Sequence, residues 1–187
     1  IIHCGMWDFI EYGCYTKLVG DNVIGVEANP QVYAEMSKPI ADKFGFKCFN
    51  EFLSDKDGEV RNFYFAGEGS SFYQGPPQWN KHTSIKVQTK TLSTLIKEQN
   101  IDLNNYDFLN IDVEGAELDI LKGFEDDLKY INVIDMETSV NDRHLSGAPH
   151  QTIVEWLSER GFGLKEMSAS YEREGWGDSV FIRNDRE

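Results

Sequence analysis

The sequence predicts a doubly wound α/β fold, in which a mainly parallel sheet is covered by helices and connected by right-handed crossovers. Two observations predict this class. Short apolar runs alternate with amphipathic helical stretches along most of the 187 residues, as in successive β-α-β units. The last two strand candidates have no helix between them, which predicts an antiparallel hairpin at one edge of the sheet.

The first part of the chain follows this pattern in order. An apolar run at residues 1–4 predicts a buried strand, residues 9–19 carry apolar side chains at helical spacing, and residues 23–26 form the next apolar run. Asn29 followed by Pro30 predicts the N-cap and first turn of a second helix, which continues to residue 44. We therefore expect strand, helix, strand and helix in succession.

Strands dominate the middle of the chain. Residues 46–53 give the third strand candidate, and the turn dipeptide Asp57-Gly58 leads into a run at residues 60–66 that predicts a hairpin arm. A long loop at residues 67–83 follows, and alternation resumes at residues 84–89.

The rest of the chain returns to alternating helices and strands. Apolar spacing predicts helices at residues 91–99, 116–122 and 151–160, and strands at residues 106–111, 131–136, 162–167 and 179–182. Gly123 follows the middle helix, where we expect it to form a left-handed cap.

The charge and cysteine content of the chain disfavour some classes of binding partner and cofactor. The chain has 18 Lys and Arg against 32 Asp and Glu, a net charge of -14 that disfavours nucleic acid and anionic membranes as partners. Three cysteines without a C-x-x-C pair indicate neither a zinc site nor a disulfide framework, so we expect a reducing, cytoplasmic setting. We also expect residues 1–187 to be a single domain cut from a longer polypeptide, because the sequence opens directly on Ile1.

Gly5 and Glu27 follow the first two strands, where ligands bind in such sheets. A carboxylate at the end of the second strand can accept the hydroxyl hydrogens of a ribose. The glycines of a phosphate-binding loop are missing at residues 6–10, which disfavours NAD and FAD and leaves a phosphate-free nucleoside such as S-adenosylmethionine. The alternative is a tight turn at Gly5 and a solvated strand end at Glu27.

Three acidic residues follow the strand at residues 106–111. Asp112 and Glu114 can share one face, and Glu117 lies in the first turn of the next helix, so we expect their carboxylates to converge. The alternative is that they are helix-start acids stabilised by the macrodipole, each by roughly 0.3–1 kcal/mol. That alternative fits Glu117 better than Asp112.

Residues 107–123, D-F-L-N-I-D-V-E-G-A-E-L-D-I-L-K-G, resemble the signature of FkbM-type S-adenosylmethionine-dependent methyltransferases. The resemblance implies a Rossmann-like class I methyltransferase fold, with a mostly parallel seven-stranded sheet, an antiparallel edge hairpin and helices on both faces. It also implies methyl transfer to a hydroxyl of a sugar, glycan or related small molecule, in domains that also occur joined to glycosyltransferases. The cofactor-binding residues it implies are Gly5, Glu27, Asn29, Ser54, Asp55 and Asp112.

The sequence departs from this family in two places. Met6, Trp7 and Asp8 make the first loop bulkier than the small residues that are usual there. Asn110 stands where the family commonly has a lysine. The altered first loop supports an alternative function, a methyltransferase-like binding or scaffold domain that no longer catalyses.

An attacking hydroxyl must lose its proton, so a positioned base is expected. The candidates are Asp112, Glu114, Glu137 and His144. As an alternative, the convergent carboxylates can bind Mg²⁺, but the sequence does not single out particular residues as its ligands. His3 is expected in the core, whereas His82 and His150 are expected in solvated loops. Aromatic residues in the 67–83 loop and Trp176 suit the apolar faces of a sugar, or pin their loops onto the core.

Overall fold

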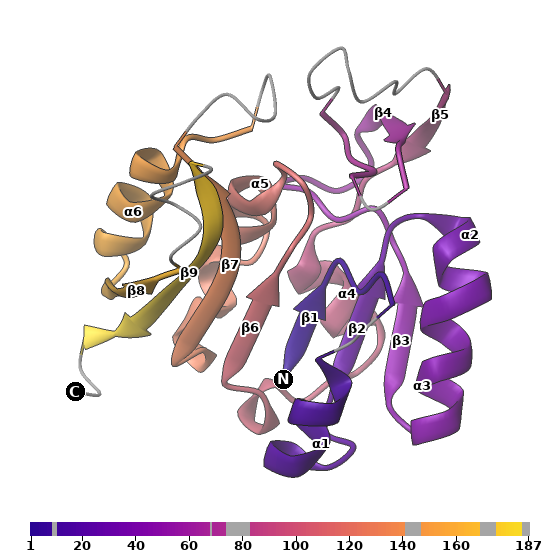
Figure 1. The fold of residues 1–187 in the computed structure, drawn as a ribbon, viewed down its shortest axis with the longest axis horizontal. Helices are drawn as coiled ribbons and strands as arrows, with labels where there is room; N and C mark the ends of the chain where they lie inside the picture. The colour runs from indigo at the N-terminus through magenta and orange to yellow at the C-terminus, as the bar shows by residue number, and fades with distance from the viewer. Residues whose placement is uncertain (9–10, 68, 74–82, 141–146, 169–174, 185–187) are drawn as a thin grey trace.

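A computed structural model describes residues 1–187 except 9–10, 68, 74–82, 141–146, 169–174 and 185–187 (Figure 1). Its main sheet has seven strands in the order β3-β2-β1-β6-β7-β9-β8. These strands are β1 (Ile2–Cys4), β2 (Ile24–Glu27), β3 (Lys47–Asn50), β6 (Phe108–Ile111), β7 (Val133–Ser139), β8 (Phe162–Met167) and β9 (Trp176–Arg183). The chain order reverses between β1 and β6, which therefore flank the switch point of the sheet.

Most strand pairs are parallel, and the last two strands form the predicted antiparallel edge. Ile2 of β1 lies between Ile24 of β2 and Leu109 of β6, in parallel register on both sides. β9 instead pairs antiparallel with both β7 and β8. Every residue of β1 and β2 is buried, which explains why both strands are short runs with little polar alternation. The predicted fold class is confirmed.

Helices cover both faces of the sheet (Figure 1). α1 (Tyr12–Val19) and α3 (Lys38–Phe44) pack on one face, where Met6, Tyr12, Tyr15 and Ala41 belong to one buried cluster. α4 (Leu92–Glu98), α5 (Glu117–Lys122) and α6 (His150–Ser158) pack on the other face and form the main core with the sheet. Short 3₁₀ turns at Leu103–Asn105 and Glu125–Tyr130 connect these layers.

The helix expected at residues 29–44 is present but not uniform. Asn29 caps it, because its side-chain oxygen accepts the N–H groups of Gln31 and Val32. α2 (Pro30–Val32) then passes through a π-helical turn, Tyr33–Ser37, into α3. The apolar spacing predicts the helix but not this wider turn, which orients Ser37 toward the loop after β1.

The strands expected at residues 60–66 and 84–89 form a separate two-stranded sheet. β4 (Val60–Phe65) pairs antiparallel with β5 (Thr83–Gln88). This small sheet lies beyond the carboxyl ends of the parallel strands, at the top of Figure 1. Its position there allows its side chains to close one side of a site at those strand ends.

The predicted left-handed cap at Gly123 is wrong. Gly123 has a φ of -70° and leads directly into the 3₁₀ turn Glu125–Tyr130. Its lack of a side chain has a different cause, because a Cβ atom there would lie 2.2 Å from the carbonyl oxygen of Ser54. Across the described residues, no helix combines the length and apolar character needed to cross a membrane.

Candidate functional site

A cavity of about 280 Å³ lies at the carboxyl ends of the parallel strands. That volume is near the lower end for small-molecule sites, which are roughly 300–1,000 Å³. Residues that follow β1, β2, β3 and β6 line it, together with Glu137 of β7 and Phe63 of β4. The cavity therefore spans the switch point between β1 and β6, where open α/β sheets bind ligands.

Gly5 and Asp112 meet at this switch point. The φ of Gly5 is +87°, and a Cβ atom there would lie 1.6 Å from the carbonyl oxygen of Asp112. Glycine is therefore required by the close approach of the chain's own backbone, as well as by the turn. Both residues line the cavity.

Glu27 places a buried carboxylate at the end of β2. The residue is 7% exposed, and its two oxygens accept the backbone N–H groups of Trp7, at 3.0 Å, and Asn29, at 2.7 Å. Burial raises the pKa of Glu27 above its ordinary value, and these N–H groups act in the opposite direction. The carboxylate is thus fixed in direction at the cavity wall.

The bulky first loop packs against the sheet. Met6 is 1% exposed and lies over Gly25, where a Cβ atom would come within 1.8 Å of its sulfur. Trp7 has a φ of 41°, which is uncommon for a side chain of this size, and its carbonyl oxygen accepts the hydroxyl of Ser37 at 3.3 Å. Met6 and Trp7 therefore form part of the cavity wall and do not fill the cavity.

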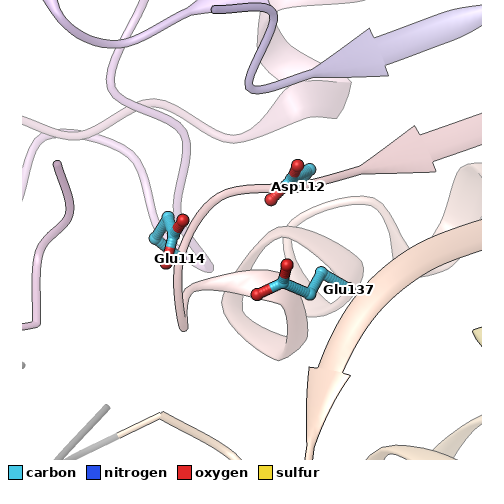
Figure 2. A group of neighbouring side chains, drawn as sticks. All are labelled: Asp112, Glu114 and Glu137. Atoms are coloured by element: carbon cyan, nitrogen blue, oxygen red, sulfur yellow. The ribbon is translucent and has the colours of Figure 1, made fainter. Parts of the chain in front are cut away.

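Three carboxylates come together beside the switch point, at the ends of β6 and β7. One oxygen each of Asp112, Glu114 and Glu137 lies within 4.8 Å of the others. Figure 2 shows Asp112 and Glu114 on the loop after β6, and Glu137 on β7. Such a group can accept a proton from a bound hydroxyl, or it can bind a divalent cation through oxygen ligands.

Glu117 lies close to this group but does not line the cavity. It is 5% exposed, and its carboxyl oxygen accepts the N–H of Gly115 at 2.8 Å. Burial raises its pKa to about 8, and the charges of Asp112 and Glu114 act in the same direction. Glu117 is therefore mostly uncharged at pH 7 and supports the loop as a neutral acid.

Only some of the residues expected to form the site line the cavity. Gly5, Glu27, Asp112, Glu114 and Glu137 all line the cavity. Three expected cofactor-binding residues, Asn29, Ser54 and Asp55, do not line it, and His144 lies outside the described residues.

The three residues outside the cavity have other contacts. Asn29 caps α2 and borders a neighbouring groove. Ser54 is fully buried, and its hydroxyl bonds Asp55 and Arg61. β3 ends at Asn50, earlier than the predicted strand, so residues 51 and 53 occupy the positions expected for Ser54 and Asp55.

The cavity is also lined by residues that were not among the expected catalytic or cofactor-binding residues. Further lining residues are His3, Met6, Trp7, Asp8, Glu11, Glu51, Ser70, Ser71, Phe72, Ala116 and Trp176. Trp176 stood out in the sequence as an aromatic residue near the end of the chain. Glu51 carried no comparable signal, because its position depends on where β3 ends.

The described histidines lie in the interior. His3 is 3% exposed, and its Nδ1 lies 3.4 Å from the Tyr15 hydroxyl, as expected for a core residue. Burial lowers its pKa to about 4, so it is neutral at pH 7. The expectation of a solvated His150 is wrong, because this residue is 7% exposed at the start of α6 and its Nδ1 lies 2.9 Å from the Thr138 hydroxyl. His82 is outside the described residues.

Comparison with known proteins identifies relatives of this architecture. A family model for the methyltransferase FkbM domain matches residues 3–164. No curated protein matches the chain.

Two solved structures have a similar fold. One is TrmK from M. capricolum in complex with S-adenosylhomocysteine, with 14% identity and a TM-score of 0.52 over 98% of this chain. The other is a protein of the NADB-Rossmann superfamily from Streptococcus agalactiae, with 14% identity and a TM-score of 0.50 over 97% of this chain. The chain spans 61% of the length of each of these structures.

Proposed function

The chain belongs to the FkbM methyltransferase family, and on this basis we propose that it is an S-adenosylmethionine-dependent O-methyltransferase. Its acceptor is a hydroxyl group of a sugar, a glycan or a related small molecule. The observation that carries the proposal is one cavity lined by both the fixed carboxylate of Glu27 and the group formed by Asp112, Glu114 and Glu137.

The residues at the cavity fit a nucleoside without phosphates. The N–H groups of Trp7 and Asn29 fix the two oxygens of Glu27 at the cavity wall. A carboxylate at the end of the second strand is the group that accepts ribose hydroxyls in such folds. The described lining residues include no Lys or Arg, and the first loop has no glycine cradle for a pyrophosphate.

The carboxylates supply the chemistry that a hydroxyl acceptor requires. When bound, S-adenosylmethionine supplies a methyl group on a sulfonium centre that is open to in-line displacement. Asp112, Glu114 or Glu137 accepts the proton that the attacking hydroxyl loses, a role that contributes about 10²–10⁴ in rate. The cavity walls align the reacting groups, which can contribute roughly 7–11 kcal/mol.

The acceptor side of the cavity suits a polyhydroxyl compound. Trp176 and Glu137 both line the cavity, so an indole ring and a carboxylate border the same space. A sugar presents apolar faces and hydroxyl edges that match this combination. The net charge of -14 disfavours nucleic acid as the substrate.

Transfer of a labelled methyl group tests the proposal. The protein is incubated with S-adenosyl-L-[methyl-³H]methionine and a panel of mono- and oligosaccharides that includes both neutral sugars and uronic acids, and label is measured in the saccharide fraction. We expect label that survives mild alkali, because a methyl ether is stable there whereas a methyl ester releases methanol. Alkali-labile label would instead indicate transfer to a carboxyl group.

A second function is supported by the first loop. Met6 is almost fully buried and Trp7 already bonds Glu27, as a binding or scaffold domain without catalysis would allow. Calorimetry with S-adenosylmethionine separates the two functions, because only the enzyme must bind it. An absence of binding heat together with no label transfer would favour the binding domain.

A further inference from the structure

Arg61 lies in β4, outside the cavity, and connects the small sheet to the main fold. Its Nη1 donates to Oδ2 of Asp119 at 2.9 Å and to Oγ of Ser54 at 2.7 Å. Asp119 belongs to α5, and Ser54 lies in the segment after β3. One guanidinium group therefore joins three parts of the chain that are distant in sequence.

The same guanidinium also holds the segment that follows β4. Its central carbon lies 4.4 Å from the ring centre of Phe72 and 5.5 Å from that of Tyr73. The Tyr73 hydroxyl donates to the same Asp119 oxygen at 2.8 Å. Arg61, Tyr73 and Asp119 thus form one connected unit, with Phe72 packed against it.

Phe72 carries this arrangement into the cavity. It is 9% exposed, lines the cavity beside Ser70 and Ser71, and packs edge-on against Phe63 with ring centres 5.9 Å apart. Phe63 is a second cavity residue, on β4 itself. The wall formed by these two rings therefore depends on where Arg61 holds the small sheet.

The ion pair between Arg61 and Asp119 is partly removed from water, so its loss should destabilise this part of the structure. The side chains of Arg61 and Asp119 are 23% and 18% exposed. Removing one member of such a pair leaves the other charge without its partner in a poorly solvated position. Truncation of Arg61 should therefore release both the small sheet and the loop that carries Phe72.

We propose that Arg61 is a positioning residue that sets the affinity of the cavity for the nucleoside cofactor by fixing the Phe72 wall. It acts through Phe72 and Asp119 and does not touch the cofactor. This inference rests on the proposed function, because it assumes that the cavity holds the adenosyl group. Arg61 offers no proton acceptor, so its replacement should weaken cofactor binding more than it slows turnover at saturating cofactor.

Calorimetric titration with S-adenosylhomocysteine tests the inference. Arg61→Ala is compared with the unaltered protein and with Phe72→Ala, and we expect both substitutions to weaken binding at least tenfold. Arg160→Ala is the matched control. Arg160 also pairs with a glutamate, at 2.7 Å from Glu125, and stacks 3.6 Å from the Trp156 ring centre, but none of these three residues lines the cavity. We expect it to lower the melting temperature and to leave affinity within twofold.

The outcomes separate the inference from the function on which it rests. If the unaltered protein does not bind S-adenosylhomocysteine, the proposed function fails. If it binds and Arg61→Ala binds within twofold of it, or if Arg160→Ala loses affinity equally, the positioning role is overturned. If circular dichroism shows that Arg61→Ala is unfolded, Arg61→Lys replaces it, because a lysine keeps the charge but lacks the planar fork. An affinity loss of at least threefold is then expected, and an unchanged affinity overturns the role.

Discussion

The backbone N–H of Trp7 donates a 3.0 Å hydrogen bond to Oε2 of Glu27 and so links the loop after β1 to the end of β2. Asn29 donates to the other oxygen of the same carboxylate at 2.7 Å. Glu27 therefore holds the first loop and faces the proposed ribose position with the same group. A substitution of this carboxylate should therefore change both the position of the first loop and the affinity for the cofactor.

Glu27→Gln should weaken S-adenosylhomocysteine binding at least tenfold. A glutamine side chain has one acceptor oxygen, so its NH₂ group would face an N–H donor of Trp7 or Asn29. Hydrogen bonds to charged groups contribute about 1.5–3 kcal/mol, and each 1.4 kcal/mol is about tenfold in affinity. The check is calorimetry, with Glu159→Gln on the exposed end of α6 as the control. Equal affinities for both variants would remove Glu27 from the binding site.

Gly25→Ala should reduce the space available to the cofactor. The added methyl group would overlap the sulfur of Met6, which must then move, and Met6 already lines the cavity. We expect weaker S-adenosylhomocysteine binding and a lower melting temperature.

Gly13→Ala in α1 provides the matched comparison for Gly25→Ala. Apart from its chain neighbours and the backbone of its own helix, no described atom lies within 4 Å of the methyl group it adds. Helix propensity predicts a gain of up to about 1 kcal/mol in stability there. If Gly25→Ala bound as tightly as Gly13→Ala, Met6 would not be limiting the cavity.

Asp112→Asn should lower kcat by about 10²–10⁴ while the KM for S-adenosylmethionine changes little. The substitution keeps the size of the side chain but removes the group that accepts a proton. Steady-state kinetics with the acceptor found in the labelling experiment provides the measurement. Near-normal turnover in both Asp112→Asn and His144→Ala would show that the base lies elsewhere, with Glu114 and Glu137 as the remaining carboxylates.

Excess chelator should leave turnover unchanged. Asp112, Glu114 and Glu137 are close enough to share a cation, but one of these carboxylates can accept the proton without metal help. The assay is run with EDTA and again after addition of Mg²⁺. Activity that disappears with EDTA and returns with Mg²⁺ would assign the three carboxylates to a metal site instead.

Glu117 should make the folded state less stable as the pH rises. Burial raises its pKa from an ordinary value of 4.5 to about 8, so the folded state binds the proton more tightly than the unfolded state. This contribution is fully present below the unfolded pKa and is lost as the pH rises through the folded one. The free energy of unfolding should therefore fall by up to about 1.4 kcal/mol per pH unit within that window.

Glu117→Gln isolates this effect from other groups. The amide is neutral at every pH, and its oxygen can still accept the Gly115 N–H. Asp135, whose pKa burial raises to about 6, acts in the same direction but is present in both proteins. Melting temperatures between pH 5.5 and 8.5 should diverge as the pH rises, with the variant the more stable. Parallel curves would contradict the buried neutral state of Glu117.

The sequence predicts the sheet because its signals are local. Parallel strands that are buried on both faces, such as β1 and β2, are mostly apolar runs in the sequence. The dipeptide Asn29-Pro30 predicts the start of a helix from two adjacent residues. Gly5, Glu27 and Asp112 could be predicted as cavity residues because Glu27 is the last residue of such a strand and the other two directly follow one.

The predictions that differ from the structure concern residues whose environment is set by contacts with residues far away in the sequence. Gly123 is a glycine because the Ser54 backbone approaches it, and this contact cannot be seen in the helix pattern around it. His150 is buried because Thr138 on β7 lies beside it. Ser54 and Asp55 missed the cavity because β3 ends at Asn50, and the end of a strand is set by pairing with its neighbour.

A crystal structure of the protein with S-adenosylhomocysteine tests the central claim most directly. The account predicts electron density for the nucleoside in the cavity that Gly5 and Asp112 line, with both ribose hydroxyls within hydrogen-bond distance of the Glu27 carboxylate. Density that leaves this cavity empty at saturating ligand, or that places the ribose away from Glu27, would contradict it.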